Sequence, residues 1–313
     1  MDKHIKIHFA PMQGLTDEPF RRLHAKYFGG VDFYYTPFIR IERGLFRKRD
    51  LRDLTAEQMS NVIPQILPSS AEELKHLCEP ILEKGCKQID VNVGCPFPPV
   101  MAHGRGAALL NNPDSFADVL KGIRELSNDI SFSLKMRLGY SDSNQWQASI
   151  DAINDTPLAY VTMHARIAKQ QYRGTCDMGA FGQFAAQCKH PLVYNGDILT
   201  TEGAENVLRQ WPNLQGLMIG RGLLGNLDLG RKLRGDVVDG QDFIARFKAF
   251  HEELFLAAKS RMTEDRQVAE HLKPYWDYFF QYADRKDLKA IRKSHKSDDY
   301  MAAVCALLSH LGQ

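Results

Sequence analysis

Short apolar runs recur along the first two thirds of the chain, with polar or glycine-containing segments between them. They cover residues 5–11, 31–37, 62–67, 88–93, 131–137, 160–164, 191–195 and 216–220. Most intervals between them hold an amphipathic stretch long enough for a helix, such as 71–84 and 113–126. Strands that alternate with helices predict a parallel sheet. Eight such units over roughly 225 residues predict an α/β fold of the TIM (β/α)8 type.

The pattern changes after residue 221. The segment 235–240 is rich in turn residues, and no strand pattern follows it. Apolar and aromatic residues recur instead at helical spacing over 243–259, 267–282 and 298–310. We therefore expect a barrel domain over residues 1–237 and a C-terminal all-helical domain over 238–313. The aromatic cluster of 275–282 is interpreted as the core of the helical domain, in preference to a base-stacking surface.

Composition places the chain among ordinary soluble proteins. It has 313 residues, of which 44% are hydrophobic and 25% charged. No apolar run approaches the roughly 18 residues that a membrane span needs, and charged residues followed directly by a strand at the start argue against a signal peptide. The six cysteines form no Cys-x-x-Cys pair and no metal-ligand spacing, which is typical of free thiols in a reducing cytosol. We expect a cytoplasmic monomer with no metal and no membrane partner.

Polar residues stand where several of the predicted strands end. The segment Asn92-Val93-Gly94-Cys95-Pro96 closes the fourth strand, so that Gly94 permits a sharp turn and Pro96 ends the strand beyond the thiol. A loop cysteine beside turn residues is the plain alternative. Comparable residues at other strand ends are Gln65, Lys135, Arg137, His164, Asn195, Asp197 and Arg221. Because the carboxyl ends of barrel strands meet on one rim, these residues predict an active site there.

Two glycine-containing segments predict a phosphate site. Asn195-Gly196-Asp197 and Gly220-Arg221-Gly222 end the seventh and eighth strands, the place where TIM barrels commonly bind phosphate. Lys135 and Arg137 would be costly to bury without an anionic partner. A buried ion pair with Asp90 is one alternative, and a core role for His164 is another. Taken together, Lys135, Arg137 and His164 favour a large, planar, anionic ligand.

Several motifs of the chain resemble those of a known family. The motifs are Ala10-Pro11-Met12-x-Gly14-x-Thr16-Asp17, Gln65, Asn92-x-Gly94-Cys95-Pro96, Gly106-Ala107-Ala108-Leu109-Leu110, Lys135-x-Arg137, His164-x-Arg166, Asn195-Gly196-Asp197 and Gly220-Arg221-Gly222. Their order and spacing are similar to those of the tRNA-dihydrouridine synthases. The resemblance implies an FMN-dependent barrel that uses NADPH to reduce the C5–C6 bond of particular uridines in tRNA, and a helical tail that binds RNA.

The resemblance also assigns roles to residues. It implies that FMN is held by Pro11, Met12, Gln13, Gln65, Lys135, His164, Asn195, Gly196, Asp197, Gly220 and Arg221, with Cys95 as the proton donor. A thiol with an ordinary pKa near 8.5 is mostly protonated at neutral pH and is able to donate a proton to C5. Asn92 and Arg137 would then bind the edge of a uracil that has left its stack.

An RNA partner should leave basic patches on the chain. Segment 285–296 holds six Lys or Arg against one Asp, and Arg285, Lys289, Arg292 and Lys296 recur in it at a spacing that predicts one face of a helix. Segment 40–53 holds six Lys or Arg against three acidic residues. Solvated surface is the plain alternative for each patch. If the patches bind tRNA, the contacts come from Arg40, Lys289, Arg292, Lys293 and Lys296, largely to the backbone.

Three other functions remain open from the sequence. One is an FMN barrel that reduces a small pyrimidine or an enoate. Another is a barrel that binds phosphorylated metabolites without flavin, and the third is a non-catalytic RNA-binding protein. The chain also departs from the family pattern, with Ala165 in place of the commoner glycine and a stiff Phe97-Pro98-Pro99 after the cysteine. His103 and Arg105 add polar bulk to that loop, so its closure is an open point of the prediction.

Overall fold

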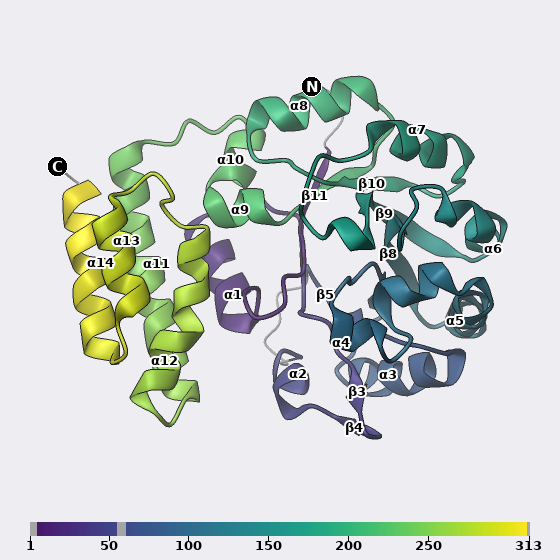
Figure 1. Cartoon of the computed structure of the whole chain (residues 1–313), viewed down its shortest axis with the longest axis horizontal. Coiled ribbons are helices and arrows are strands. Elements are labelled where there is room, and N and C mark those ends of the chain that lie inside the picture. The colour runs from purple at the N-terminus through teal and green to yellow at the C-terminus, as the bar shows by residue number, and fades with distance from the viewer. Residues whose placement is uncertain (1–4, 55–60, 312–313) are drawn as a thin grey trace. The chain divides into compact units, whose positions relative to one another are not determined.

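The computed structural model describes residues 5–54 and 61–311, and a parallel sheet rolled into a barrel dominates it (Figure 1). The strands are β1 (Lys6–Phe9), β2 (Phe33–Tyr35), β5 (Val62–Ile63), β6 (Gln65–Ile66), β7 (Gln88–Val93), β8 (Ser131–Gly139), β9 (Leu158–Ile167), β10 (Leu192–Asn195) and β11 (Gly216–Ile219). They pair in the order β5-β2-β1-β11-β10-β9-β8-β7-β6. Every pair in this sheet is parallel.

Pro64 explains why the sheet has nine strands and eight positions. It stands between β5, which pairs with β2, and β6, which pairs with β7. Proline has no N–H to give to a ladder, so the strand is interrupted there. The flanking carbonyls still bond across both sides, with Thr36 N to Ile63 O at 3.1 Å and Asp90 N to Pro64 O at 2.9 Å. One interrupted strand thus completes a TIM barrel, and the predicted fold class and all eight predicted strands are confirmed.

Helices follow the barrel strands, and the main ones are α3 (Ala71–Glu83), α5 (Pro113–Leu126), α6 (Ile150–Asn154), α7 (Met178–Gln187) and α8 (Thr201–Gln210). Helices α3 and α5 begin at side-chain caps. The Ser70 hydroxyl accepts the Glu73 amide at 3.1 Å, and Asn112 caps α5 just before Pro113. Helices α3 and α5 pack so closely at Gly122 that a Cβ on this residue would lie 2.9 Å from Ala71 Cα.

Short elements occupy the loops of the barrel. They are the hairpin β3 (Ile41–Glu42) and β4 (Leu45–Phe46), the helices α2 (Lys48–Arg52) and α4 (Pro98–Met101), and the 3-10 turns η1 (Gly106–Asn111), η2 (Gln145–Ser149) and η3 (Ala168–Gln170). Arg43 and Gly44 make the hairpin turn with φ of 52° and 76°. Two consecutive positive φ values are typical of a type I′ hairpin turn.

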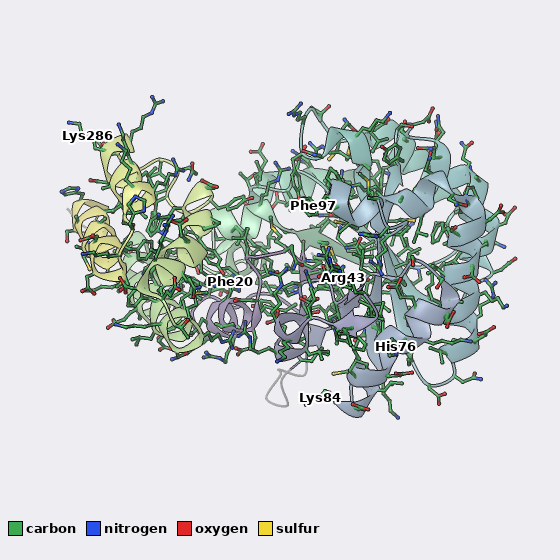
Figure 2. All side chains as sticks on the ribbon, turned by 60° about the horizontal axis from the view of Figure 1, so that its bottom comes forward. Phe20, Arg43, His76, Lys84, Phe97 and Lys286 are labelled. Carbon is green, nitrogen blue, oxygen red and sulfur yellow. The ribbon has the colours of Figure 1, made fainter. Side chains whose placement is uncertain are left out.

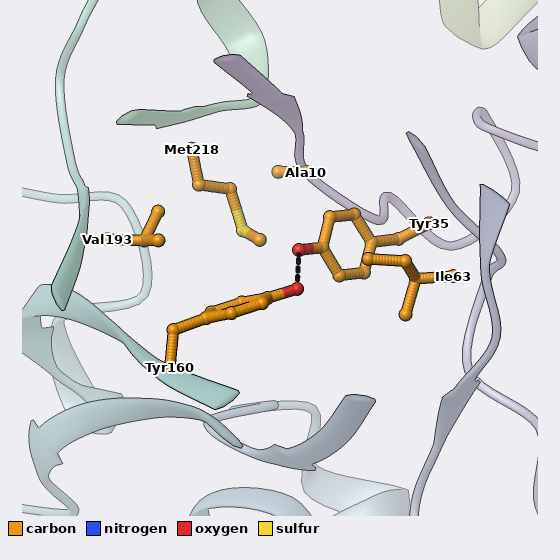
Figure 3. Packing of buried hydrophobic residues seen from close by; sticks show 6 residues of the cluster. All are labelled: Ala10, Tyr35, Ile63, Tyr160, Val193 and Met218. Atoms are coloured by element: carbon orange, nitrogen blue, oxygen red, sulfur yellow. Dashed lines mark hydrogen bonds between the residues drawn. The ribbon is translucent and has the colours of Figure 1, made fainter. Parts of the chain in front are cut away.

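The barrel interior combines apolar packing with a hydrogen-bonded tyrosine pair (Figure 3). The cluster consists of Ala10, Tyr35, Ile63, Tyr160, Val193 and Met218. The hydroxyls of Tyr35 and Tyr160 are 2.6 Å apart, and His8 Nδ1 lies 2.7 Å from the Tyr35 hydroxyl. Burial lowers the pKa of His8 to about 3, so this histidine is neutral.

The chain divides into two compact units. The first holds the residues up to Pro11 together with Asp32–Ile198 and Glu205–Ile219, and it contains the whole parallel sheet. The second holds Met12–Val31, Leu199–Ala204 and the chain from Gly220 onward. The predicted domain boundary between residues 237 and 238 stays a prediction.

The second unit is built from helices and the loops between them, with no strand among its described residues. It contains α1 (Glu18–Tyr27), α9 (Arg221–Gly225), α10 (Leu229–Leu233), α11 (Gly240–Arg261), α12 (Asp265–Leu272), the 3-10 turn η4 (Lys273–Asp277), α13 (Arg285–Lys293) and α14 (Ser297–Leu311). Its core holds Tyr275, Trp276, Phe279 and Phe280, as expected, whereas Tyr282 is 76% exposed. Among the described residues, no helix is both long and apolar enough to cross a membrane.

Two helices of this unit are shorter than the sequence pattern predicts. The pattern over 267–282 is divided, because α12 ends at Leu272 and Pro274 cannot continue its hydrogen-bond ladder. Helix α13 ends at Lys293. Lys296 therefore lies in the connection to α14 and not on the face of α13.

Candidate active site

Alternating polar residues of three neighbouring strands build the site in the first unit. On β7 they are Asp90 and Asn92, on β8 Ser133, Lys135 and Arg137, and on β9 Thr162, His164 and Arg166. The strand register places Asn92 beside Lys135, Lys135 beside Thr162 and Arg137 beside His164. Because side chains two residues apart share one face of a strand, these groups gather on the side of the sheet that carries Tyr160.

The backbone of Cys95 is fixed on both sides. The side-chain oxygen of Asn92 accepts the amides of Gly94 at 3.0 Å and Cys95 at 2.9 Å. The Cys95 carbonyl accepts the Ala107 amide at 3.0 Å. Burial raises the pKa of the Cys95 thiol, against the smaller opposing effects of the Phe97 amide and nearby cations. The thiol is thus held in its protonated form, which suits a proton donor.

The loop that follows Cys95 is fastened to helix α3. Arg105 forms an ion pair with Glu73, whose Oε2 also accepts the Ser69 amide at 2.8 Å. Phe97, which Figure 2 labels, precedes α4. It is 54% exposed. Arg105, one of the two polar residues noted in this loop, therefore anchors the loop to α3.

A chain of buried amide groups connects Asn92 to a carboxylate. Asn92 Nδ2 donates to Gln65 Oε1 at 2.8 Å, and Gln65 Nε2 donates to Asp90 Oδ2 at 2.7 Å. The hydroxyl of Ser133 donates to the other oxygen of Asp90 at 2.6 Å. Asp90 and Gln65 are fully buried. Burial raises the pKa of Asp90 to about 6, and the bonds from Ser133 and Gln65 and the charge of Lys135 oppose this rise.

Lys135 is a half-buried cation without a carboxylate at ion-pair distance in the part of the chain that the structure describes. Its Nζ donates to Asn195 Oδ1 at 3.2 Å, and Asn195 Nδ2 donates to Met218 O at 2.7 Å. Burial, aided by the charge of Arg137, lowers the pKa of Lys135 to about 8. A cation in this situation fits an anionic or electron-rich ligand, and this is the observation that favours a flavin there.

Arg137 is buried and binds three backbone carbonyls. Its Nε donates to Gly94 O at 3.0 Å, and its Nη1 donates to Ile167 O at 3.1 Å and Gln171 O at 2.9 Å. Burial lowers its pKa to about 10, which leaves it cationic. Among the described residues Nη2 has no hydrogen-bond partner, so it is the part of the guanidinium that remains for a ligand.

The turn after β10 is held by Arg166. This buried residue forms a bidentate ion pair with Asp197, at 2.9 Å from Nη1 and 2.5 Å from Nη2, and also donates to Gly174 O at 2.6 Å. Gly196 has a φ of 150°, and a Cβ there would lie 2.5 Å from Cys176 Sγ. His164 Nε2 lies 3.5 Å from Arg166 Nη1. The sequence assigned no role to Arg166 or Cys176. The arginine could have been found, because Thr162, His164 and Arg166 occupy alternate positions and therefore share one face of β9.

The remaining predicted cofactor residues lie where the chain passes from one unit to the other. Pro11 is the last residue of the first segment of the barrel unit, and Met12 and Gln13 begin the next segment. The Met12 amide donates to the Thr16 hydroxyl at 2.8 Å, and the Tyr275 hydroxyl donates to Leu15 O at 2.6 Å within the second unit. Gly220 and Arg221 stand at the start of α9. The roles of these residues toward FMN stay predictions.

The predicted RNA contacts are exposed, with one exception. Lys289, Lys293 and Lys296 are solvent-exposed, and Lys286 projects outward from α13 (Figure 2). Arg292 is exposed as well but donates to Trp276 O at 3.0 Å. Arg40 is the exception, because its side chain is largely covered, forms an ion pair with Glu42 and lies over the ring of Phe38.

Comparison with known sequences identifies the family. The profile of the family described as dihydrouridine synthase matches residues 8–308. The chain is 30% identical over 222 residues to tRNA-dihydrouridine synthase B of Pasteurella multocida, an alignment that covers 71% of this chain and 66% of that protein. It is 30% identical over 242 residues to a tRNA-dihydrouridine(16) synthase of Haemophilus ducreyi, with 74% of each protein covered.

The chain belongs to the dihydrouridine synthase family. The family predicted from the motifs, and with it the expected class of enzyme, is confirmed. A probable tRNA-dihydrouridine synthase of Rhizobium leguminosarum is 28% identical, and the alignment spans 88% of this chain and 86% of that protein. The alignments with these three relatives thus cover between 66% and 86% of the relative's length.

Solved structures agree with the barrel fold of this chain. The old yellow enzyme homologue of Zymomonas mobilis superimposes with a TM-score of 0.56 at 13% identity, over 74% of this chain and 88% of that one. Histamine dehydrogenase from Rhizobium sp. gives a TM-score of 0.55 at 11% identity, over 74% of this chain and 45% of that one. At such identities the likeness concerns the fold.

Proposed function

We propose that this synthase reduces the C5–C6 double bond of specific uridines in tRNA, with FMN as cofactor and NADPH as reductant. The observation that carries the proposal is a protonated, positionally fixed thiol, Cys95, among buried cations in a barrel of the dihydrouridine synthase family. Bound FMN would supply the hydride. The protein itself must hold the cofactor, bind the uracil and donate a proton.

The residues of the barrel suit a flavin. The cation of Lys135 has no carboxylate at ion-pair distance among the described residues, so negative charge on the ligand would offset the cost of its burial. Gln65 and Asn195 supply amide groups, and the Asn195-Gly196-Asp197 turn, held by Arg166, is proposed for the phosphate end. The family resemblance adds Pro11, Met12, Gln13, His164, Gly220 and Arg221.

The uracil would be bound beside the thiol. Hydride addition at C6 leaves negative charge on C5 and O4, and the Cys95 thiol would protonate C5. Arg137 Nη2 and the second N–H of Asn92 are the groups proposed to bind the carbonyl edge of the base. A base inside a helix stack cannot reach such a site, so the uridine must be flipped out or already unpaired.

The tRNA itself would be bound through its phosphates by basic residues. Lys289, Lys293, Lys296 and Arg292 are exposed in or next to α13, which suits phosphate contacts. Arg40 is proposed for a second contact, in which a phosphate would take the place of Glu42 as its partner. We further propose that the protein is a cytoplasmic monomer. Its barrel domain would extend to residue 237, and a helical RNA-binding domain would follow.

Analysis of modified nucleosides tests the activity. Total tRNA from a strain that lacks the gene is digested to nucleosides, and dihydrouridine is quantified by mass spectrometry against the parent strain. We expect a specific loss that the wild-type gene restores and the gene encoding Cys95→Ala does not. An unchanged dihydrouridine content would refute the RNA substrate and leave a small pyrimidine or an enoate. Purified protein should be yellow, with a flavin absorbance spectrum, and a colourless preparation would refute the flavin.

A further inference from the structure

Cys95 is linked to a buried charge by a chain of hydrogen bonds. Ser133 and Gln65 donate to Asp90, and Asn92 donates to Gln65. The backbone amides of Gly94 and Cys95 donate to Asn92. All five bonds have lengths between 2.6 and 3.0 Å. Asp90, Gln65 and Ser133 have no exposed surface, and Asn92 retains 8%. Water therefore cannot replace a partner that turns away.

The direction of each bond follows from the two ends of this chain. An ionised carboxylate only accepts hydrogen bonds, so Gln65 must turn its NH2 group toward Asp90 and its oxygen toward Asn92. Asn92 must then turn its NH2 group toward Gln65 and its oxygen toward the turn. At the other end, the amides of Gly94 and Cys95 are donors only. The two side-chain amides are satisfied in one orientation each, and that orientation fixes the turn that carries Cys95.

We propose that Asp90 is a positioning residue whose negative charge sets the orientation of the Gln65 and Asn92 amides and thereby holds the backbone of Cys95. This inference rests on the proposed role of Cys95 as proton donor. Asp90 does not take part in the chemistry. The groups facing it are Ser133 and the Lys135 cation on β8, the hydroxyls of Tyr35 and Tyr160, and the Gln65 amide. At pH 8 its carboxyl group is ionised, because its pKa of about 6 lies well below that pH.

The proposal predicts a defect and its rescue by a second substitution. Asn92→Asp keeps an oxygen toward the turn but turns its other oxygen toward Gln65 Oε1. Gln65 then cannot satisfy both neighbours, because carboxylates flank it on either side. In the double variant Asp90→Asn, Asn92→Asp the whole chain reverses: Ser133 donates to the amide oxygen at position 90, the NH2 group there donates to Gln65, and Gln65 donates to the carboxylate at position 92. Every group is again paired, and the net charge is unchanged.

Amide hydrogen exchange on the flavin-loaded protein measures the effect where it occurs. A peptide that spans residues 93–95 reports the Gly94 and Cys95 amides, and Pro96 adds no amide signal. At pH 8 we expect Asn92→Asp to exchange at least about fivefold faster than wild type, the factor that corresponds to the loss of one buried hydrogen bond. The double variant should return to within about twofold of wild type. Melting temperatures should follow the same order, and the defect of Asn92→Asp should shrink as the pH falls and the paired carboxyls take up a proton.

Single variants and the enzymatic assay complete the test. Ser133→Ala keeps the charge of Asp90 and its bond to Gln65, so the exchange at 93–95 should stay within about twofold of wild type. A double variant as fast as Asn92→Asp would overturn the proposal. If Asn92→Asp does not fold, a folded double variant supports the proposal and an unfolded one overturns it. Because exchange is independent of turnover, the two proposals fail separately: wild-type protein that forms no dihydrouridine would refute the proposed function, and the exchange results would still decide the role of Asp90.

Discussion

Gly106 lies directly against the backbone of Cys95. A Cβ at Gly106 would be 2.8 Å from the Cys95 carbonyl oxygen and 3.0 Å from the Cys95 Cβ, and the φ of Gly106 is +61°. Two residues eleven positions apart in the sequence therefore fit together only when one of them has no side chain. The glycine of the Gly106-Ala107-Ala108-Leu109-Leu110 motif thus helps to set the position of the residue that carries the thiol.

Replacing this glycine should displace the thiol. We expect Gly106→Ala to lower dihydrouridine formation by at least about tenfold, since small displacements of a reacting group are costly. Gly104→Ala is the matched control, because Gly104 lies in the same loop with a φ of +69° but a Cβ there would have no neighbour within 4 Å. Both variants carry the backbone strain, so turnover that falls equally in the two would contradict a specific contact with Cys95.

Removal of the thiol should separate catalysis from cofactor binding. Asn92 binds the backbone amide of Cys95 and not its sulfur, so Cys95→Ala retains the turn. We expect bound flavin and its reduction by NADPH to persist, and dihydrouridine formation to fall by the roughly 10²–10⁴-fold typical of a missing general acid. Flavin absorbance, single-turnover reduction and nucleoside analysis give the three quantities. A colourless variant or near-normal turnover would show that Cys95 has another role.

The sequence predicted the barrel because its signal is local. Each strand is a short apolar run, and the polar residues at Asn92, Lys135 and Arg137 alternate as one face of a strand requires. The sequence could not predict which polar residue binds which. Arg137 was expected to bind substrate, and the structure shows three of its bonds directed to the carbonyls of Gly94, Ile167 and Gln171.

The pairing of Asp90 with Gln65 and of Arg166 with Asp197 was equally hidden. These contacts join residues that are 25 and 31 positions apart, and they depend on the register of neighbouring strands. The ends of α12 and α13 were missed for a different reason. Apolar spacing continues past Leu272, and basic residues keep a helical spacing up to Lys296. Pro274 nevertheless ends α12, and α13 stops at Lys293 before a short connection to α14.

The half-buried charge of Lys135 should make stability depend on pH. Its pKa in the folded protein is about 8, below the ordinary 10.5, so between these values the unfolded chain binds more protons than the folded one. Stability therefore rises with pH over this window. On flavin-free protein, Lys135→Met should be more stable than wild type at pH 7 by roughly 2 kcal/mol, and the difference should shrink toward pH 10. Urea unfolding at the two pH values measures this. Lys289→Met, at an exposed site, is the control, and a constant difference at Lys135 would contradict the prediction.

The hydroxyl of Tyr275 should contribute to stability through the loop after β1. It donates to the Leu15 carbonyl at 2.6 Å, and both residues are buried. Tyr275→Phe leaves that acceptor without this bond and should lower the free energy of unfolding by about 1–2 kcal/mol. Tyr282→Phe removes a hydroxyl from a side chain that is 76% exposed and should change nothing measurable. Equal stability of the two variants would mean that the Tyr275 bond is replaced by solvent.

The basic residues in and after α13 should contribute to RNA affinity by binding phosphates. Lys289, Lys293 and Lys296 are exposed, whereas Arg292 also bonds to Trp276 O and is better left in place. The triple Lys→Gln variant at these three positions should bind tRNA more weakly, and its log–log salt slope should fall by roughly 0.7–0.9 for each phosphate that is no longer bound. Flavin reduction by NADPH should not change.

A second triple variant separates phosphate binding from net charge. Lys84, Lys121 and Lys189 are exposed lysines in the barrel unit, and their replacement by Gln removes the same three charges. If residues 289–296 bind phosphates, this control should keep the slope of wild type while the α13 variant releases between two and three fewer counterions, about one for each phosphate. Affinity measured at several salt concentrations decides the matter. Parallel lines for wild type and the α13 variant would remove these lysines from the RNA-binding surface and leave the segment that begins at Arg40 as the candidate.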